Sequence, residues 1–496
     1  MIYNPKRGDK PLCLQGRNSI RIHTNPPRGT APNPGVLISA VVYNQAMSAP
    51  VFRAPSKRSR ATAAVLFATV LTLIAAGCAA GTPDATPAGT ADVVEVPKDA
   101  ATITEAIGLV REGGLVLVDP GTYDESVTVD KADVTVRGTE RNSVVIDGEG
   151  LRSNGIQVIA SGVRIQNLTV KNHTFNGVLV TGLHDKNGAQ AHNLDGYQKL
   201  DPEKFPPLER FEISNVTASN NGLYGIYAFN SSHGVIRDNY TSGSADSGFY
   251  VGQCANCDIL VTGNVAENNA IGHENANASD SVVVTGNRFT NNRVGLTLLS
   301  WYQEAYLPQK SATVVGNVIA DNNSAESPAQ ALGAFGLGVG LSGANSNRLE
   351  RNLIAGNQST GVQITNTEDL SSTGNTLTGN DFADNGVDVA DLSATRAPSS
   401  DTCITDSGSG LTVVPSSFAD SCGADTTGGT TSADLPALEV PAGISFLKVI
   451  AGPEQPGLEG DLTEIPQKLP AAVVMPDLTA ITVPDRSLLA DLVVQQ

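Results

Sequence analysis

A short motif that recurs along most of the chain constrains its fold more than any other feature. Each copy is a β-rich run ending in Asn, an Asn-Asn pair, and then Gly with alternating apolar residues, as in Val284–Asn287, Asn291–Asn292 and Gly295–Leu298. The first Asn of successive copies falls 48, 24, 25, 23, 30, 35 and 23 residues after the one before, so the period is near 24. These positions are Asn167, Asn215, Asn239, Asn264, Asn287, Asn317, Asn352 and Asn375.

This period fits one coil of a parallel β-helix made of two or three short strands. Leucine-rich repeats have a similar period, but their Leu-x-x-Leu-x-Leu core is missing here. Val and Ile at equivalent places would stack into one core, while Gly and Asn would occupy bends that need a positive φ. Asn at the same place in every coil can also form a ladder of side-chain amides. We therefore predict an all-β, parallel β-helix solenoid over residues 93–394.

The N-terminal end of this solenoid carries a predicted cap. Thr102 and Glu105 have the spacing of a capping box, and the run Ala106–Val110 that follows is amphipathic. We expect a short helix here that covers the apolar end of the first coil.

The stretch from Thr102 to Gly148 resembles the opening of a known family. The segments Glu105–Ile107, Pro120–Tyr123 and Ile146–Gly148 are similar to those of right-handed parallel β-helix proteins of the pectate-lyase-like superfamily. The sugar-binding and hydrolase type, which includes NosD-like proteins, is the nearest. The resemblance implies a right-handed solenoid. Because the superfamily holds lyases, hydrolases, epimerases, adhesins and non-enzymes, it does not define an activity.

Residues 47–77 have the pattern of a bacterial signal peptide. Four basic residues between 53 and 60 precede an uncharged apolar run that is too short for a spanning helix. The run ends at Cys78 in a sequence that resembles a lipobox, so we expect Cys78 to be lipidated; an ordinary signal peptide is the alternative. Residues 78–92 then form a tether, and residues 1–46 are interpreted as a start-site artefact upstream of Met47.

Charge is distributed unevenly around this boundary. Residues 1–77 hold ten Lys and Arg and one acid, which leaves 22 basic and 49 acidic residues in the rest of the chain. A body this acidic repels nucleic acid and anionic lipid. We expect an extracytoplasmic protein that is lipid-anchored to the cell membrane, or secreted if Cys78 is unmodified, and whose partner is a polysaccharide or another envelope component.

Four cysteines remain outside the doubtful N-terminal segment and the lipobox: Cys254, Cys257, Cys403 and Cys422. An even number outside the cytoplasm favours disulfides. The Cys254-x-x-Cys257 pair has two alternatives, a soft-metal site and a redox dithiol. Copper binding there is what the NosD-like resemblance implies.

Candidate ligand-binding residues are expected where insertions interrupt the coils, because a β-helix exposes its site beside such loops. The insertion 181–210 combines imidazoles with carboxylates that could bind a metal or act as acid and base. The insertion 301–310 pairs aromatic faces with a carboxylate, which suits a sugar ring. The candidates are His184, Asp185, His192, Asp195 and Tyr197 in the first, Trp301, Tyr302 and Glu304 in the second, and His273, Glu274 and Arg293 in nearby coils.

No known catalytic motif accompanies these residues. The Asn-Thr-Asp, Asp-Asp and Gly-His-Gly series of polygalacturonase-like hydrolases is absent, as is the Asp-Pro-His-Glu motif of alginate epimerases. We therefore favour a binding protein over a polysaccharide lyase, epimerase or hydrolase; a lyase would imply bound Ca²⁺, and no metal site is assigned. Residues 395–434 are expected as a Cys-containing linker, and residues 435–496 as a Pro-punctuated tail that partly packs along the solenoid.

Overall fold

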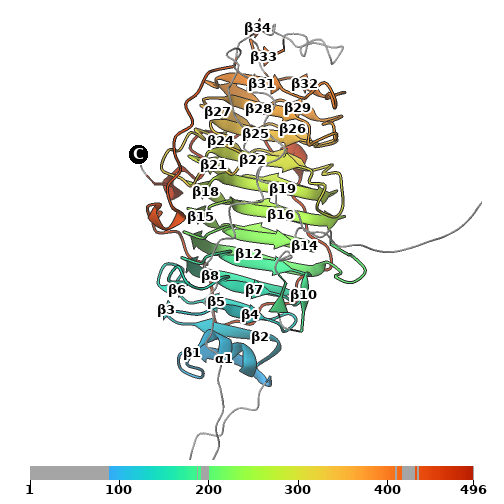
Figure 1. Cartoon of the computed structure of the whole chain (residues 1–496). Coiled ribbons are helices and arrows are strands. Elements are labelled where there is room, and N and C mark those ends of the chain that lie inside the picture. The colour runs from blue at the N-terminus through green and yellow to red at the C-terminus, as the bar shows by residue number, and fades with distance from the viewer. Residues whose placement is uncertain are drawn as a thin grey trace, which may run out of the picture. The chain divides into compact units, whose positions relative to one another are not determined.

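The computed structural model describes residues 89–186, 188–190, 200–407, 410–415, 431–432 and 435–494. From residue 91 to residue 432 the described chain winds into stacked coils, most of them with three strands (Figure 1). One coil consists of β17 (Ile259–Thr262), β18 (Val265–Glu267) and β19 (Ile271–Ser279), and each of these strands pairs in parallel with its equivalent in the next coil. The predicted all-β, parallel β-helix is confirmed.

The strands form three parallel ladders, which we call the first, second and third sheets. The first two join through β8 and β12, which bend from one into the other. The first sheet contains β1 (Ala91–Val96), β2 (Val110–Val118), β5 (Thr135–Gly138), β8 (Val163–Lys171), β12 (Leu208–Ser219), β14 (Ser231–Arg237), β17, β20 (Val282–Thr285), β23 (Thr313–Val315), β26 (Arg348–Glu350), β29 (Thr376–Thr378) and β32 (Cys403–Thr405).

The second sheet adds a short strand to most coils. It contains β3 (Gly121–Tyr123), β6 (Val144–Asp147), the later parts of β8 and β12, β15 (Tyr240–Ser242), β18, β21 (Arg288–Thr290), β24 (Val318–Ala320), β27 (Leu353–Ala355) and β30 (Asp381–Ala383). The third sheet contains β4 (Val127–Val129), β7 (Ile156–Val158), β9 (Val178–Thr181), β13 (Ile226–Phe229), β16 (Ser247–Ala255), β19, β22 (Val294–Leu299), β25 (Leu337–Ser342), β28 (Thr360–Thr365), β31 (Val387–Asp391), β33 (Thr412–Val414) and β34 (Thr431–Ser432).

Aliphatic side chains in register fill the interior of the coils. Successive side chains of a strand point to opposite faces, so every second residue is directed inward. In the first sheet one such row is fully buried and consists of Ile213, Ile236, Val261, Val284 and Val314. Rows of this kind from the three sheets form one continuous core, which is how the repeated Val and Ile positions stabilise the fold.

Two ladders of buried Asn side chains follow the corners between the sheets. At the corner between the first and second sheets, each Asn Nδ2 donates to the Oδ1 of the equivalent Asn one coil further on, over 2.9 Å at every step. This ladder consists of Asn239, Asn264, Asn287, Asn317, Asn352 and Asn380. A second ladder, between the second and third sheets, consists of Asn269, Asn292, Asn322, Asn357 and Asn385. The predicted amide ladders are confirmed.

The sequence alignment of the Asn residues was only partly correct. Asn167 and Asn215 occupy the left-handed position one residue before the ladder, where four later coils have Gly and two have Asp238 and Arg351, and their φ values are +58° and +52°. Asn375 accepts from Asn347 in a separate short ladder, and Asn380 is the true equivalent of Asn352. Asn tolerates a left-handed backbone as well as forming side-chain amide bonds, so residue type alone could not distinguish the two positions.

The glycines that begin the third-sheet strands have a different role from the one predicted. Their φ values are not positive; instead, a Cβ on Gly272 would lie 2.5 Å from the carbonyl oxygen of Gly295 in the next coil. Glycine is required there because the backbones of adjacent coils approach closely. The prediction of positive φ holds for the glycines just before the first Asn ladder, such as Gly286 at +65°.

The helix α1 (Ile103–Leu109) caps the first coil as predicted (Figure 1). The Thr102 hydroxyl accepts from the Glu105 amide, and the Glu105 carboxylate accepts from the amide of Ala101. The helix buries Ile103, Ala106 and Ile107 against the apolar end of the solenoid.

Stacked strands continue beyond residue 394. Cys403 pairs in register with Thr376, and Val413 pairs with Val389. Part of the segment 395–434, which we expected as a linker, therefore contributes strands to the solenoid. No helix in the described part of the chain is long and apolar enough to cross a membrane.

The C-terminal tail (residues 435–494) runs in an extended conformation along the solenoid (Figure 1, orange to red). Short 3₁₀ turns at Phe446–Lys448, Leu478–Ala480 and Ala490–Leu492 interrupt it. Its backbone carbonyls accept hydrogen bonds from arginines of the coils: Arg137 donates to Leu462, Arg141 to Pro456, Arg164 to Gln467, Arg288 to Leu488, Arg293 to Pro441 and Arg351 to Leu478. The tail thus packs on the solenoid over most of its own length.

Candidate functional site

The outer face of the third sheet carries a cluster of aromatic side chains. In these coils a Gly lies at the start of the third-sheet strand. The residue after this Gly points into the core and the next one points outward, which places Leu179, Tyr227 and Tyr250 in one outward row. The ring of Tyr224 stacks on that of Tyr227 with centroids 4.2 Å apart, and the Tyr227 and Tyr250 rings meet edge to face at 4.6 Å. Such a cluster is unusual on the outside of a solenoid, where polar side chains normally lie.

Three carboxyl groups adjoin this aromatic cluster. Glu274 follows Tyr250 in the same outward row, and its Oε2 accepts from the hydroxyl of Ser247 at 2.7 Å. The same hydroxyl lies 3.4 Å from Oδ1 of Asp246. The hydroxyl of Tyr250 lies 3.5 Å from Oε2 of Glu304. We call these residues, with Tyr224, Tyr227 and Trp301, the third-sheet site.

The pKa values of two of these carboxyl groups are displaced upward. Burial raises the pKa of Asp246 to about 6, against the opposing effect of hydrogen bonds from Tyr224 and Ser247. Burial also raises the pKa of Glu274 well above its usual range, and the negative charges of Asp246 and Glu304 raise it further. Glu274 is almost fully buried, whereas Asp246 is partly exposed. Asp246 is therefore the member of the pair that solvent or a ligand can reach.

Two inserted segments pack against the aromatic cluster. The hairpin of β10 (His184–Asp185) and β11 (Gly188–Ala189) contributes Leu183 and Ala189. The segment 301–306 contributes Trp301, which is half-buried. Asn277 fixes this segment because its side chain accepts from the amide of Trp301 at 2.7 Å and donates to the carbonyl of Ala305 at 2.9 Å. The loop is thus held in one conformation beside the carboxyl groups.

His273 and Arg293, which we expected to face the same site as Glu274, lie elsewhere. His273 alternates with Glu274 along β19, so its ring points inward, is fully buried and stacks on Phe289 at 5.7 Å. Burial lowers the pKa of His273 to about 3, which keeps the ring neutral. Arg293 is buried under the tail, where it donates to Ser327, Pro441 and Ala442.

The remaining sequence candidates are divided between the site and its surroundings. Glu274, Trp301 and Glu304 belong to the third-sheet site. His184 and Asp185 lie on the adjoining hairpin, and the Tyr302 hydroxyl donates to Asp369. His192, Asp195 and Tyr197 lie outside the described residues, as do Cys78 and Cys422.

Sequence reasoning missed Tyr224, Tyr227, Tyr250, Asp246 and Ser247. A signal for two of them was present, because Tyr227 and Tyr250 both follow Gly by two residues in adjacent coils. That offset is the outward position, and aromatic residues at it in consecutive coils must stack on each other.

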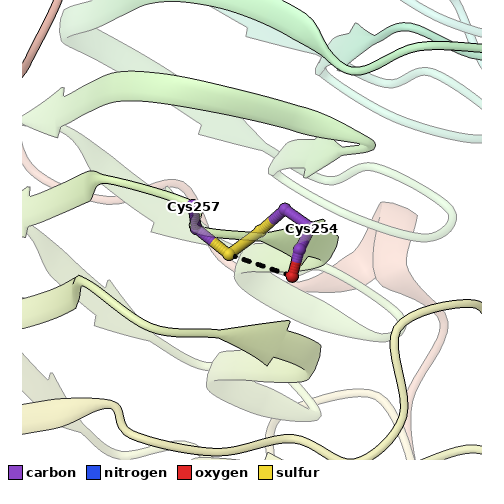
Figure 2. Close-up of a disulfide and its surroundings, with 2 residues drawn as sticks. All are labelled: Cys254 and Cys257. Atoms are coloured by element: carbon purple, nitrogen blue, oxygen red, sulfur yellow. Dashed lines mark hydrogen bonds between the residues drawn. A yellow bond between two sulfur atoms is a disulfide. The ribbon is translucent and has the colours of Figure 1, made fainter. Parts of the chain in front are cut away.

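The Cys254–Cys257 disulfide is present, as predicted (Figure 2). Both side chains are fully buried and belong to the main core, so this pair acts as part of the solenoid interior. A copper role would require both thiols to be reduced and accessible. Within the described part of the chain, no group of three or more His, Cys, Asp or Glu residues is placed to hold a metal ion.

Comparison with known proteins defines the class to which this molecule belongs. The family model of the right-handed β-helix region matches residues 141–311 and 302–422, which together cover more than half of the chain. The chain therefore belongs to the right-handed β-helix family. No curated protein matches the sequence significantly.

Several solved structures are similar. The mannuronan C-5 epimerase AlgE4 A-module of Azotobacter vinelandii is 16% identical, with a TM-score of 0.39, 60% of this chain covered and 87% of that one. ORF18 of Geobacillus virus E2 is 14% identical, with a TM-score of 0.44 and coverage of 64% and 63%. The pectin methylesterase PemA of Erwinia chrysanthemi is 14% identical, with a TM-score of 0.32 and coverage of 46% and 79%. Function has to be argued from the site itself.

Proposed function

We propose that this protein binds a polysaccharide of the cell envelope at the third-sheet site. The observation that carries the proposal is the cluster of tyrosines on the outward side of the third sheet, with a half-buried Trp and three carboxyl groups beside it. Sugar rings present apolar C–H faces and hydroxyl groups, so aromatic surfaces with adjacent hydrogen-bond acceptors suit them. The arginines Arg137, Arg164 and Arg288, which bind the tail, belong to the first two sheets, whereas the site lies on the third.

Binding can be measured by isothermal titration and by retention on immobilised envelope polysaccharides, including peptidoglycan, chitin and β-glucan. Tyr224→Ala and Trp301→Ala should each weaken binding by at least about tenfold, as loss of an aromatic contact does in binding sites. Val474→Ala removes an exposed apolar side chain of the tail, and should leave binding unchanged. If the wild-type protein binds none of these polysaccharides, the proposal fails.

A lipid anchor at Cys78 forms the second part of the proposal. An anchor would hold the solenoid at the outer side of the bacterial membrane, next to such a polysaccharide. Cells grown with an alkyne-tagged fatty acid should label the wild-type protein but not a Cys78→Ser variant, which should be released from the membrane. An unlabelled wild-type protein would show that the molecule is secreted without an anchor.

A second candidate function is acid–base catalysis on the bound polysaccharide. The raised pKa values of Asp246 and Glu274 favour it, because a carboxyl group that keeps its proton near neutral pH can act as a general acid. Release of reducing or unsaturated sugar from a polysaccharide that binds, abolished in Asp246→Asn, would establish a lyase or hydrolase. Binding without release of product would leave the binding function alone.

A further inference from the structure

Three polar side chains in two adjacent coils interrupt the apolar interior of the solenoid. Thr241 of β15 and His273 and Asn275 of β19 point inward, since their neighbours in each strand point outward. Each of the three is fully buried. The equivalent residues in the coils on either side are apolar: Ala218 and Ala266 for Thr241, Phe249 and Leu296 for His273, and Val251 and Leu298 for Asn275.

None of these three side chains has a hydrogen-bond partner among the described residues. Both ring nitrogens of His273, both polar atoms of the Asn275 amide and the hydroxyl of Thr241 are buried and unpaired. Almost all buried polar groups in proteins bond either to the protein or to ordered water, because an unpaired group in an apolar interior is costly. A partner other than the described chain is therefore expected here.

The second Asn ladder is interrupted in the first of these coils. Ser244 occupies the ladder position between Asn221 and Asn269, because its backbone amide donates to Oδ1 of Asn269 as that of Asn269 does to Asn292. A serine hydroxyl is shorter than an asparagine amide, and among the described residues both this hydroxyl and Nδ2 of Asn221 are unpaired. Oδ1 of Asn269 accepts one hydrogen bond within the same residues, where Oδ1 of Asn292 accepts two.

The unpaired groups of the ladder and of the strands are close together. A Cβ on Gly225 would lie 2.9 Å from Cγ2 of Thr241 and 3.2 Å from Oγ of Ser244. A Cβ on Gly248, one coil further on, would lie 2.3 Å from Oγ1 of Thr241. The residue after Gly248 pairs in register with His273. The polar groups thus belong to one region of the core.

We propose that these two coils enclose an internal hydration site, in which ordered water molecules bond to the unpaired polar groups. Water suits the site because the groups include donors and acceptors but no charged side chain. Burial lowers the pKa of His273 to about 3, so its ring is neutral and offers one donor and one acceptor. The inference does not depend on what binds at the third-sheet site, although β19 carries Glu274 of that site on its outer face.

One of these waters takes the place of the amide that Ser244 lacks. It accepts from Nδ2 of Asn221 and donates to Oδ1 of Asn269, as an Asn side chain does in the later coils. The others bond to the inward side chains of β15 and β19. Because a buried water makes about three hydrogen bonds, about two or three waters satisfy the unpaired atoms.

A high-resolution crystal structure of the full chain tests the site directly. We expect water density within hydrogen-bonding distance of Asn221 and Asn269, and again of His273 and Asn275. Magnetic relaxation dispersion of the water signal counts long-lived internal waters in solution and should detect the same molecules. Direct hydrogen bonds from these side chains to other protein groups, with no water between them, would overturn the proposal.

Variants assign the waters to the site. Ser244→Asn restores the missing amide, so it should displace one water and raise the melting temperature by about 1 °C or more. The double variant Thr241→Val, Asn275→Leu makes these positions apolar like their neighbours and should also reduce the number of long-lived waters. Thr376→Val makes a matched change on the outer face of β29 and should leave that number unchanged. The wild-type number of waters in both core variants would overturn the site.

Discussion

At the scale of single residues, the buried asparagines determine the register of the coils. Oδ1 of Asn287 accepts from both the backbone amide and Nδ2 of Asn264, and its own Nδ2 donates to Val261, Thr285 and Asn317. Five hydrogen bonds thus depend on one fully buried side chain. A hydrophobic replacement would leave several of these partners unpaired inside the protein, which is far more costly than the net value of a hydrogen bond.

We predict that Asn287→Ala lowers the free energy of unfolding by about 3 kcal/mol, because it leaves buried donors unsatisfied. Gly286→Ala, one residue earlier, should cost only about 1 kcal/mol, since it strains a left-handed backbone position with φ +65° but has open space around the added methyl group. Urea denaturation of both variants checks the difference. Equal effects would mean that the side-chain ladder contributes little.

The acids of the third-sheet site should make stability depend on pH in the direction opposite to most carboxylates. The folded protein holds a proton on Asp246 up to about pH 6, whereas the unfolded chain releases it near its ordinary value of 3.8. Because the native state binds more protons, stability falls as pH rises through this window. Melting temperatures measured from pH 4 to pH 8 should therefore decline less in Asp246→Asn than in the wild-type protein. A steeper decline in the variant would contradict the raised pKa.

At the scale of elements, the segment 301–306 is held by one side chain that can be removed without disturbing the backbone. Asn277 has a φ of +45°, which Gly adopts readily, so Asn277→Gly removes three side-chain hydrogen bonds to the loop and preserves the turn. Trp301 is the single Trp of the chain and reports on its own surroundings. We predict that Asn277→Gly shifts Trp fluorescence to longer wavelength and weakens polysaccharide binding.

The matched control for this variant is Asn230→Gly. Asn230 has an equivalent backbone conformation with φ +53°, but its side chain donates to Phe205 and Pro206 in a different loop. The control should leave the emission of Trp301 unchanged. An unshifted spectrum in Asn277→Gly would show that packing against the aromatic cluster alone holds the loop.

The elements also show how far the sequence could predict this molecule. Period, apolar alternation and the capping box follow from local chemistry, so the solenoid and α1 were predictable. The opposite orientations of the His273 and Glu274 side chains were predictable in principle, since neighbouring residues of a strand point to opposite faces of the sheet. The burial of Arg293 was not, because its partners Pro441 and Ala442 lie almost 150 residues away. Asp246 and Ser247 were not predictable either, because they meet Glu274 only when one coil stacks on the next.

At the scale of the whole molecule, the tail links coils that are far apart in sequence. It binds Arg141 near the N-terminal end through Pro456 and Arg351 near the other end through Leu478. Charge-assisted hydrogen bonds of this kind contribute about 1.5–3 kcal/mol each. The tail therefore reinforces the stacking of coils that otherwise contact only their neighbours.

We predict that a chain ending at Val440 loses at least about 3 kcal/mol of its free energy of unfolding. Relative to the full chain, its backbone amides should exchange faster, and the increase should be larger in β5 and β8 than in β25. A chain ending at Leu469 keeps the partners of Arg137, Arg141 and Arg164 and should retain protection in those strands. Urea denaturation and hydrogen exchange measure both effects. Unchanged exchange in the shorter chain would show that the coils are stable without the tail.

The asparagine ladders have a further consequence. Their amides all donate in one direction, and in the ladder between the first and second sheets the Nδ2–Oδ1 distance stays at 2.9 Å whether two asparagines are 23 or 35 residues apart in the chain. Extra residues are accommodated outside the stack, so a coil accepts any neighbour that offers an Asn at the same two corners. The coil is thereby an interchangeable module. Duplication of one coil-encoding stretch of DNA would yield a longer molecule with every internal bond already specified.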